Sequence, residues 1–179
     1  IGQKIETEAN GDNVGNEKYA DLGVFYADTS EANLKKFGIQ ANADNVYLFD
    51  GIDGSGSLRA KNAASITDAV RDILIRVPKS DLYIVLNSMG GGSGSVIGPS
   101  LVSELLGRGD NVVVMTTQVS DVVKRLENTV RTFETYESIA KKRQRVLPIM
   151  LCDNGEEPEC VVNKTFTMGA RMLSILYSG

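Results

Sequence analysis

A glycine-rich run between an apolar strand and an amphipathic helix constrains this chain more than any other feature of its sequence. The short apolar stretch Leu82–Leu86 contains β-branched residues and predicts a strand buried on both faces. After the glycines, apolar residues at helical spacing predict a helix that ends at Gly107 and Gly109. The buried face of this helix should consist of Val96/Ile97, Leu101/Val102 and Leu105/Leu106.

The run has the composition of an anion-binding turn. Its glycines are Gly90, Gly91, Gly92, Gly94 and Gly98, and they are interleaved with Ser93 and Ser95. Glycines let backbone N–H groups approach an anion, and a helix N-terminus adds about half a positive charge. Gly92 and Gly94 are expected to use the freedom of glycine to adopt positive φ angles. A flexible linker is the alternative, but linkers are rarely placed between a buried strand and an amphipathic helix.

Three classes of phosphate-binding loop match this turn to different degrees. A P-loop requires Lys-Ser/Thr after the glycines, and no such pair follows here, which excludes that class. A dinucleotide site requires G-x-G-x-x-G and an acidic residue after the next strand. The spacing from Gly92 to Gly98 is G-x-G-x-x-x-G, and the next strand, Val112–Met115, leads into Thr116-Thr117-Gln118. The dinucleotide interpretation is weakened but stays open.

The third class is the tubulin/FtsZ superfamily of GTPases, whose phosphate loop is a GGGTGSG-type run between a buried strand and a helix. The run Met89-Gly90-Gly91-Gly92-Ser93-Gly94-Ser95 resembles that loop. It differs at Ser93, where Thr is usual, and at Val96, where the last Gly is usual. The whole stretch SMGGGSGSVIGPSLVSEL is most similar to the PhuZ-type phage tubulins.

Composition excludes several other functions. The 179 residues carry a net charge of −4 with a pI near 5.0, which offers no general case for nucleic-acid binding. No apolar run approaches the roughly 18 residues of a membrane span. The chain has no histidine, and its two cysteines, Cys152 and Cys160, match no common zinc spacing. Metal chemistry and Ser-His or Cys-His catalysis are therefore not expected, and a reducing cytoplasm fits best.

The rest of the chain predicts alternating strands and helices. Further strands are expected at Leu22–Ala27, Val46–Phe49, Asn111–Thr116 and Val146–Cys152. Helices are expected after Asp28-Thr29-Ser30, over Ala63–Val77, after Ser120/Asp121 and over Pro158–Tyr177. This order predicts an α/β fold, a Rossmann-like and mostly parallel sheet with helices on both faces, ending in the central helix of a tubulin fold.

Two of these helices carry specific expectations. In the helix after Asp121, the buried stripe should be Val122/Val123, Leu126, Val130 and Phe133, with Asn128 lying off it. The last helix has two apolar stripes, at 161/165/168/172/175 and 162/166/169/173/176, so it should be buried on most sides.

The resemblance assigns roles to individual residues. Gly90–Ser95 would cradle the phosphates of GTP or GDP, and Gly54, Ser55, Gly56 and Ser57 would approach the γ-phosphate. Ser120 and Asp121 lie where the family contacts the ribose, and Asn154 and Asn163 where asparagines face the guanine edge. An exposed turn is the alternative for Gly54–Ser57, a turn or capping residue for Asn154, and a solvent-facing position for Asn163. Asp50 and Asp53 would cap a turn or help to hold Mg²⁺ through water; no residue is assigned as a direct metal ligand.

The resemblance also implies what the whole protein does. Residues 1–179 would form a GTP-binding domain, with the first strand, first phosphate loop and C-terminal domain lying outside it. The full-length protein would be a GTPase that associates head-to-tail into filaments and positions viral DNA in the bacterial cytoplasm, with no direct contact to nucleic acid or membrane. Its catalytic acids would come from a loop beyond Gly179 of a neighbouring subunit, so no catalytic residue is assigned here, and the fragment alone should not hydrolyse GTP. A dinucleotide-binding or nucleotide-sensing module is the alternative.

Overall fold

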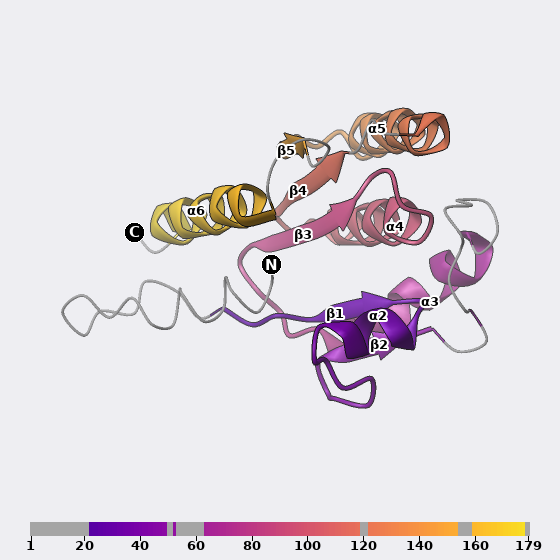
Figure 1. Ribbon diagram of the computed structural model, residues 1–179. Helices are drawn as coiled ribbons and strands as arrows, with labels where there is room; N and C mark the ends of the chain where they lie inside the picture. Colours follow the sequence, from indigo (N-terminus) through magenta and orange to yellow (C-terminus); the bar gives the residue numbers. More distant parts are fainter. Residues whose placement is uncertain (1–21, 50–51, 53–62, 119–121, 154–158, 178–179) are drawn as a thin grey trace.

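A computed structural model describes residues 22–49, 52, 63–118, 122–153 and 159–177 (Figure 1). Strands and helices alternate along these residues, which confirms the predicted α/β fold. In chain order the elements are β1 (Tyr26–Asp28), α2 (Glu31–Lys36), β2 (Val46–Leu48), α3 (Ala63–Arg76), β3 (Tyr83–Ser88), α4 (Gly94–Gly107), β4 (Val112–Gln118), α5 (Val123–Arg143), β5 (Ile149–Asp153) and α6 (Glu159–Tyr177).

The described strands form two parallel sheets. One contains β1 and β2, and the other has the order β3-β4-β5. Every pair is parallel, with Tyr26 opposite Val46, Tyr83 opposite Val112, and Val114 opposite Ile149. The arrows of β1, β2, β3 and β4 point the same way in Figure 1, so the carboxyl ends of both sheets lie on one side of the molecule.

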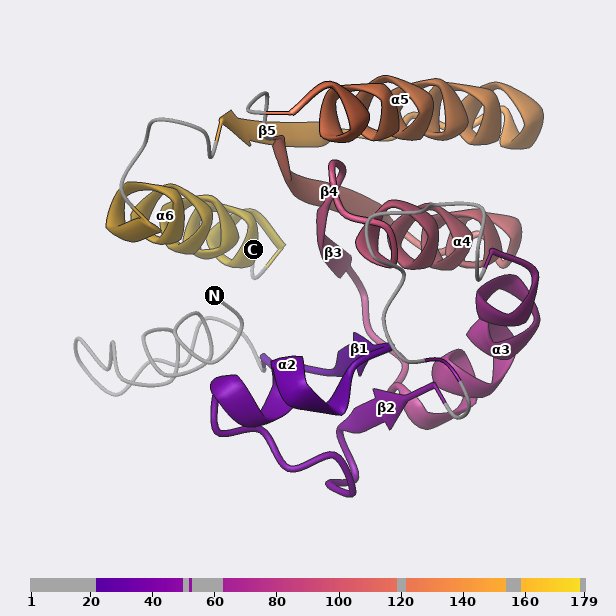
Figure 2. The same cartoon turned by 45° about the vertical axis from the view of Figure 1, so that its right-hand side comes forward.

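Alternating side chains of β3 and β4 divide the core between two helical layers, one on each face of the sheet (Figure 2). Val85 and Val114 pack with residues of α4 and α5 such as Val102. Met115 packs instead with Phe166 and Ala170 of α6. This arrangement follows from the period of two in a strand, which sends successive side chains to opposite faces.

The predicted face of α4 is confirmed, and α3 has a buried apolar face as well. Ile66, Val70, Ile73 and Leu74 are buried on α3. The apolar pairs of α4 are buried or half-buried, and the helix ends at Gly107, with Gly109 at φ +85° just after it.

The predicted face of α5 is wrong. Val123 and Leu126 of the expected stripe are 74% and 47% exposed, and only Phe133 packs against the core. The buried residues of α5 are Asn128, Thr129, Thr132 and Tyr136. The physical reason is that this side of the helix lies against backbone carbonyl groups of the glycine loop, which polar side chains can satisfy and valine cannot.

Where its side chains are described, at residues 164–173, the last helix is covered on one side, so the expectation of burial on most sides is wrong for this part of it. Phe166 and Gly169 of the second stripe are buried, as is the neighbouring Ala170. Met168 and Met172 of the first stripe are more than half exposed. Within the described residues, no helix combines the length and apolar character needed to cross a membrane.

Candidate phosphate-binding site

The glycine loop connects the carboxyl end of β3 to the N-terminus of α4. Strand β3 ends at Ser88, α4 begins at Gly94, and Met89 N–H donates to Thr117 O of β4 at 3.0 Å. Ligands of parallel α/β sheets bind at this edge, beside helix N-termini. The structure therefore brings the predicted phosphate residues Gly90–Ser95 together at the edge where an anion site is expected.

The glycines of this loop serve close approach rather than positive φ angles. Among the described glycines, only Gly38 and Gly109 have positive φ, so the expectation of positive φ in the loop is wrong. A Cβ at Gly94 would lie 2.9 Å from Ser88 O, which is backbone and cannot rotate away. Gly94 is thus required because the start of α4 lies directly against the end of β3.

Gly98 has a different requirement. A Cβ there would lie 2.7 Å from both Asn87 Cγ and Tyr136 Oη. Tyr136 Oη donates to Asn87 Oδ1 at 2.9 Å, so Gly98 leaves room for a hydrogen-bonded pair between β3 and α5. Gly98 departs from the spacing of the dinucleotide motif. The need for a glycine there is explained by this pair rather than by a ligand.

The two serines of the loop make contacts within the protein. Ser93 Oγ lies 2.6 Å from Thr29 Oγ1, and either hydroxyl can be the donor. Thr29 is buried and follows β1, so this bond joins the carboxyl ends of the two sheets. The buried Ser95 hydroxyl donates to Gly92 O at 3.0 Å, so Ser95 would present its backbone rather than its side chain to a ligand.

Two more side chains hold the backbone of the loop. Asn128 Nδ2 donates to Gly90 O at 3.2 Å, and Asn87 Nδ2 donates to Gly94 O at 3.1 Å. Arg125, in the first turn of α5, is also adjacent, because a Cβ at Gly90 would lie 3.3 Å from Arg125 Cβ. The Cβ of a cationic residue thus lies beside the loop, on its α5 side.

Sequence reasoning missed Thr29, Asn87, Asn128 and Tyr136. The sequence predicts Thr29 as part of a helix-capping cluster, and the predicted buried stripe of α5 does not include Asn128. One signal could have found the α5 residues: Asn128, Thr132 and Tyr136 recur at i, i+4 and i+8, which is one face of a helix.

The other predicted ligand residues stay predictions. Gly54–Ser57, Ser120, Asp121 and Asn154 lie outside the described residues, as do Asp50 and Asp53. Asn163 lies within the first two turns of α6. Among the described residues, no cluster of three Cys, Asp or Glu side chains could hold a metal ion.

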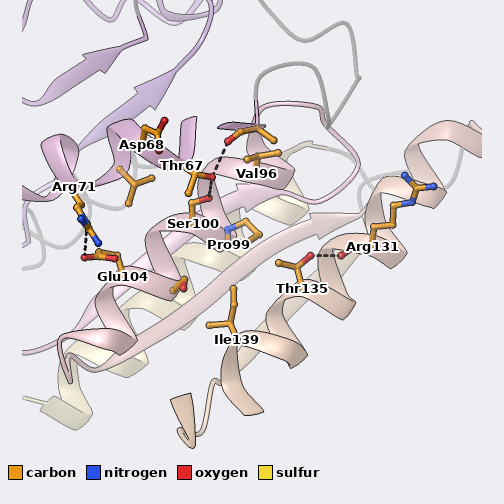
Figure 3. Close-up of a pocket in the computed structure, with 13 residues that line it drawn as sticks. Thr67, Asp68, Arg71, Val96, Pro99, Ser100, Glu104, Arg131, Thr135 and Ile139 are labelled. Carbon is orange, nitrogen blue, oxygen red and sulfur yellow. Dashed lines mark hydrogen bonds and ion pairs between the residues drawn. The ribbon is translucent and has the colours of Figure 1, made fainter. Parts of the chain in front are cut away.

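A separate groove of about 700 Å³ lies between α3, α4 and α5 (Figure 3). Thr67 and Arg71 of α3 face Ser100 and Glu104 of α4 across it, with Arg71 Nε 3.4 Å from Glu104 Oε1. None of Gly90–Ser95 lines this groove, so it is distinct from the loop.

No protein-family model matches the sequence. Among curated proteins, the chain is 35% identical over 117 residues to the phage tubulin-like protein of Pseudomonas phage PhiPA3, which covers 65% of this chain and 36% of the relative. It is 32% identical over 166 residues to the phage tubulin-like protein of Pseudomonas phage phiKZ, which covers 87% of this chain and 50% of the relative. The chain thus spans half the length or less of these relatives.

Solved structures agree with the sequence relatives. The protofilament of TubZ from bacteriophage PhiKZ superposes with a TM-score of 0.79 at 29% identity, covering 97% of this chain and 53% of that one. The phage tubulin PhuZ with GDP superposes with a TM-score of 0.75 at 24% identity, covering 97% and 52%.

The parallel sheets and the glycine loop at their carboxyl edge, with these superpositions, define a domain of the tubulin/FtsZ fold class. Within this class, the chain is a relative of the phage tubulin-like proteins. The resemblance that Met89–Ser95 indicated is therefore confirmed.

Proposed function

We propose that this chain is the GTP-binding domain of a phage tubulin-like cytoskeletal GTPase. One observation carries the proposal: within the described residues, the N–H groups of Gly90 and Gly91 have no protein acceptor. Both belong to a loop that leads into a helix N-terminus, and such groups bind phosphate oxygens. The GDP named with a solved phage tubulin is a ligand of this chemistry.

The proposed site extends along the carboxyl edge of the sheets. Gly90–Ser95 would hold the phosphates and Gly54–Ser57 would approach the γ-phosphate. Ser120 and Asp121, which follow the end of β4, would contact the ribose. Asn154 and Asn163 would face guanine, because an amide can accept from N1/N2 and donate to O6. Mg²⁺ would neutralise part of the triphosphate charge, held through water by Asp50 or Asp53.

The proposal for the whole protein is a GTP-dependent filament. Its support is that similar chains were solved as a protofilament and as a filament. Head-to-tail association would bring catalytic acids of one subunit to the GTP of the next, so hydrolysis to GDP would require the polymer. The filament would position viral DNA in the host cytoplasm, as Pseudomonas phage relatives suggest a bacterial host. We expect no direct contact of this domain with nucleic acid or membrane.

A dinucleotide-binding module is the competing function, and a thermal-shift comparison of GTP, ATP and NAD on the full-length protein separates the two. A ligand at 100 times its Kd stabilises a protein by about 2.7 kcal/mol. For a chain of about 150–250 residues, that corresponds to a rise in Tm of roughly 5–10 °C, and the rise is smaller for a longer protein. We expect this rise with GTP and a much smaller one with ATP or NAD. A larger shift with NAD would contradict the proposed function.

A further inference from the structure

Three backbone carbonyl groups of the glycine loop accept hydrogen bonds from side chains. Asn128 donates to Gly90 O, Ser95 donates to Gly92 O, and Asn87 donates to Gly94 O. The hydroxyl of Thr132 lies 3.4 Å from Met89 O, but it donates its single proton to Asn128 O at 2.6 Å. Side chains of β3, α4 and α5 thus satisfy three carbonyl groups of the loop.

Each engaged carbonyl fixes the direction of an N–H group. The peptide unit is planar and trans, so the C=O of one residue and the N–H of the next point in opposite directions. No cis peptide occurs among the described residues. With the Gly90 carbonyl held toward α5, the N–H of Gly91 must point away from α5.

Helix α5 provides one of these donors directly and supports a second through Tyr136. Its buried side is polar, and Asn128 and Tyr136 are 6% and 0% exposed. Tyr136 Oη holds Asn87 Oδ1 at 2.9 Å, so the amide of Asn87 is oriented with its Nδ2 toward Gly94 O. Thr116 Oγ1 fixes the backbone of Asn87 as well, donating to Asn87 O at 2.8 Å.

Helix α5 buries polar groups on one side and exposes valines on the other. This arrangement reduces the hydrophobic stabilisation of the fold. A helix that only covered the sheet would pack its apolar stripe inward. The arrangement is accounted for if the polar face has another task, which is to hold the loop.

We propose that α5 positions the phosphate loop: Asn128 and the Tyr136–Asn87 pair hold loop carbonyls so that the N–H groups face the nucleotide phosphates. This inference rests on the proposed function and names Asn128, Tyr136 and Asn87 as positioning residues of that site. They need not touch the nucleotide. Their effect is on the phosphate part of the ligand and not on the base.

Tyr136→Phe and Asn128→Leu in the full-length protein test the inference. Each removes a hydrogen-bond donor and keeps much of the side-chain volume. Affinities for GTP and for guanosine, which lacks phosphates, are measured by calorimetry or competition. We expect GTP binding to weaken five- to tenfold in each variant, with guanosine binding within twofold of the parent.

Tyr83→Phe is the matched control. Tyr83 Oη also donates a hydrogen bond, to Pro78 O at 3.3 Å, but it lies at the first residue of β3, at the end opposite the loop. This variant should bind GTP like the parent. Equal losses for GTP and guanosine in Tyr136→Phe would show a merely structural role and overturn the inference. So would unchanged GTP affinity in both variants. A parent protein that binds guanosine as tightly as GTP would instead overturn the proposed phosphate site itself.

Discussion

At the scale of single residues, neighbouring glycines of the loop differ in what a methyl group would meet. At Gly94 it would lie 2.9 Å from the carbonyl oxygen of Ser88 and 3.3 Å from its nitrogen. At Gly91 the nearest atoms are 4.0 Å away, which is ordinary contact. Neither residue has a positive φ, so the difference between them is one of space alone.

Gly94→Ala and Gly91→Ala therefore form a matched pair. Gly94→Ala forces α4 away from β3, and overpacking of this kind costs about 1–3 kcal/mol. Gly91→Ala should change the free energy of unfolding by less than about 0.5 kcal/mol without nucleotide. Urea unfolding monitored by circular dichroism measures both. Equal destabilisation by the two substitutions would mean that the loop lies differently against β3.

The Ser93 hydroxyl shows a second residue-scale effect. A hydroxyl has one proton and two lone pairs, so Ser93 can either donate to Thr29 or accept from it, as a threonine could. A serine at this position therefore keeps the chemistry of the threonine that the family usually has.

At the scale of elements, α5 shows that apolar residues at helical spacing are not always buried. Its apolar residues recur at helical spacing, yet Leu126 is 47% exposed, whereas Leu105 of α4 is 2% exposed. The same substitution at these two positions should have very different effects.

We expect Leu105→Ala to lower the free energy of unfolding by about 2–5 kcal/mol, the range for a buried leucine. Leu126→Ala should lower it by less than about 1 kcal/mol. Chemical denaturation of the monomeric protein without nucleotide makes the comparison. A loss at Leu126 as large as that at Leu105 would restore the face that periodicity predicted.

The contrast between α4 and α5 shows what could be predicted from this sequence. Where both faces of an element meet apolar neighbours, as in β4 and α4, the pattern of apolar residues is sufficient. The predicted burial of β3 on both faces is wrong, because Leu86 is 36% exposed. In α5 the neighbour is the backbone of a loop, and a hydrophobic pattern holds no information about that.

The same limit applies to the site. Gly90–Ser95 could be found because their spacing is local. Thr29 reaches Ser93 across 64 positions, and Asn128 reaches Gly90 across 38. Bonds of that separation depend on how the elements pack, so the residues that support the loop emerged only from the structure.

At the scale of the whole molecule, two sheets meet at the glycine loop. The β1-β2 sheet contacts α4 through a cluster that includes Phe49, Val96 and Ile97, and Thr29 joins it to Ser93. Movement of either sheet would therefore displace the loop. This geometry suits a protein whose assembly and nucleotide state are linked, as the proposed filament requires.

The catalytic prediction belongs to the same scale. Phosphoryl transfer needs a positioned water and charge stabilisation together. The sequence contains no histidine, and no acidic residue lies within Gly90–Ser95. The 179-residue chain should therefore bind GTP and release phosphate at close to the uncatalysed rate, at every protein concentration. The full-length protein should turn over GTP at a rate per subunit that rises steeply with concentration, because the acids would come from the next subunit.

A phosphate-release assay over a concentration series compares the 179-residue chain with the full-length protein, with sedimentation of the same samples as a control for assembly. First-order turnover by the 179-residue chain alone would place the catalytic group within it and refute the requirement for a neighbour.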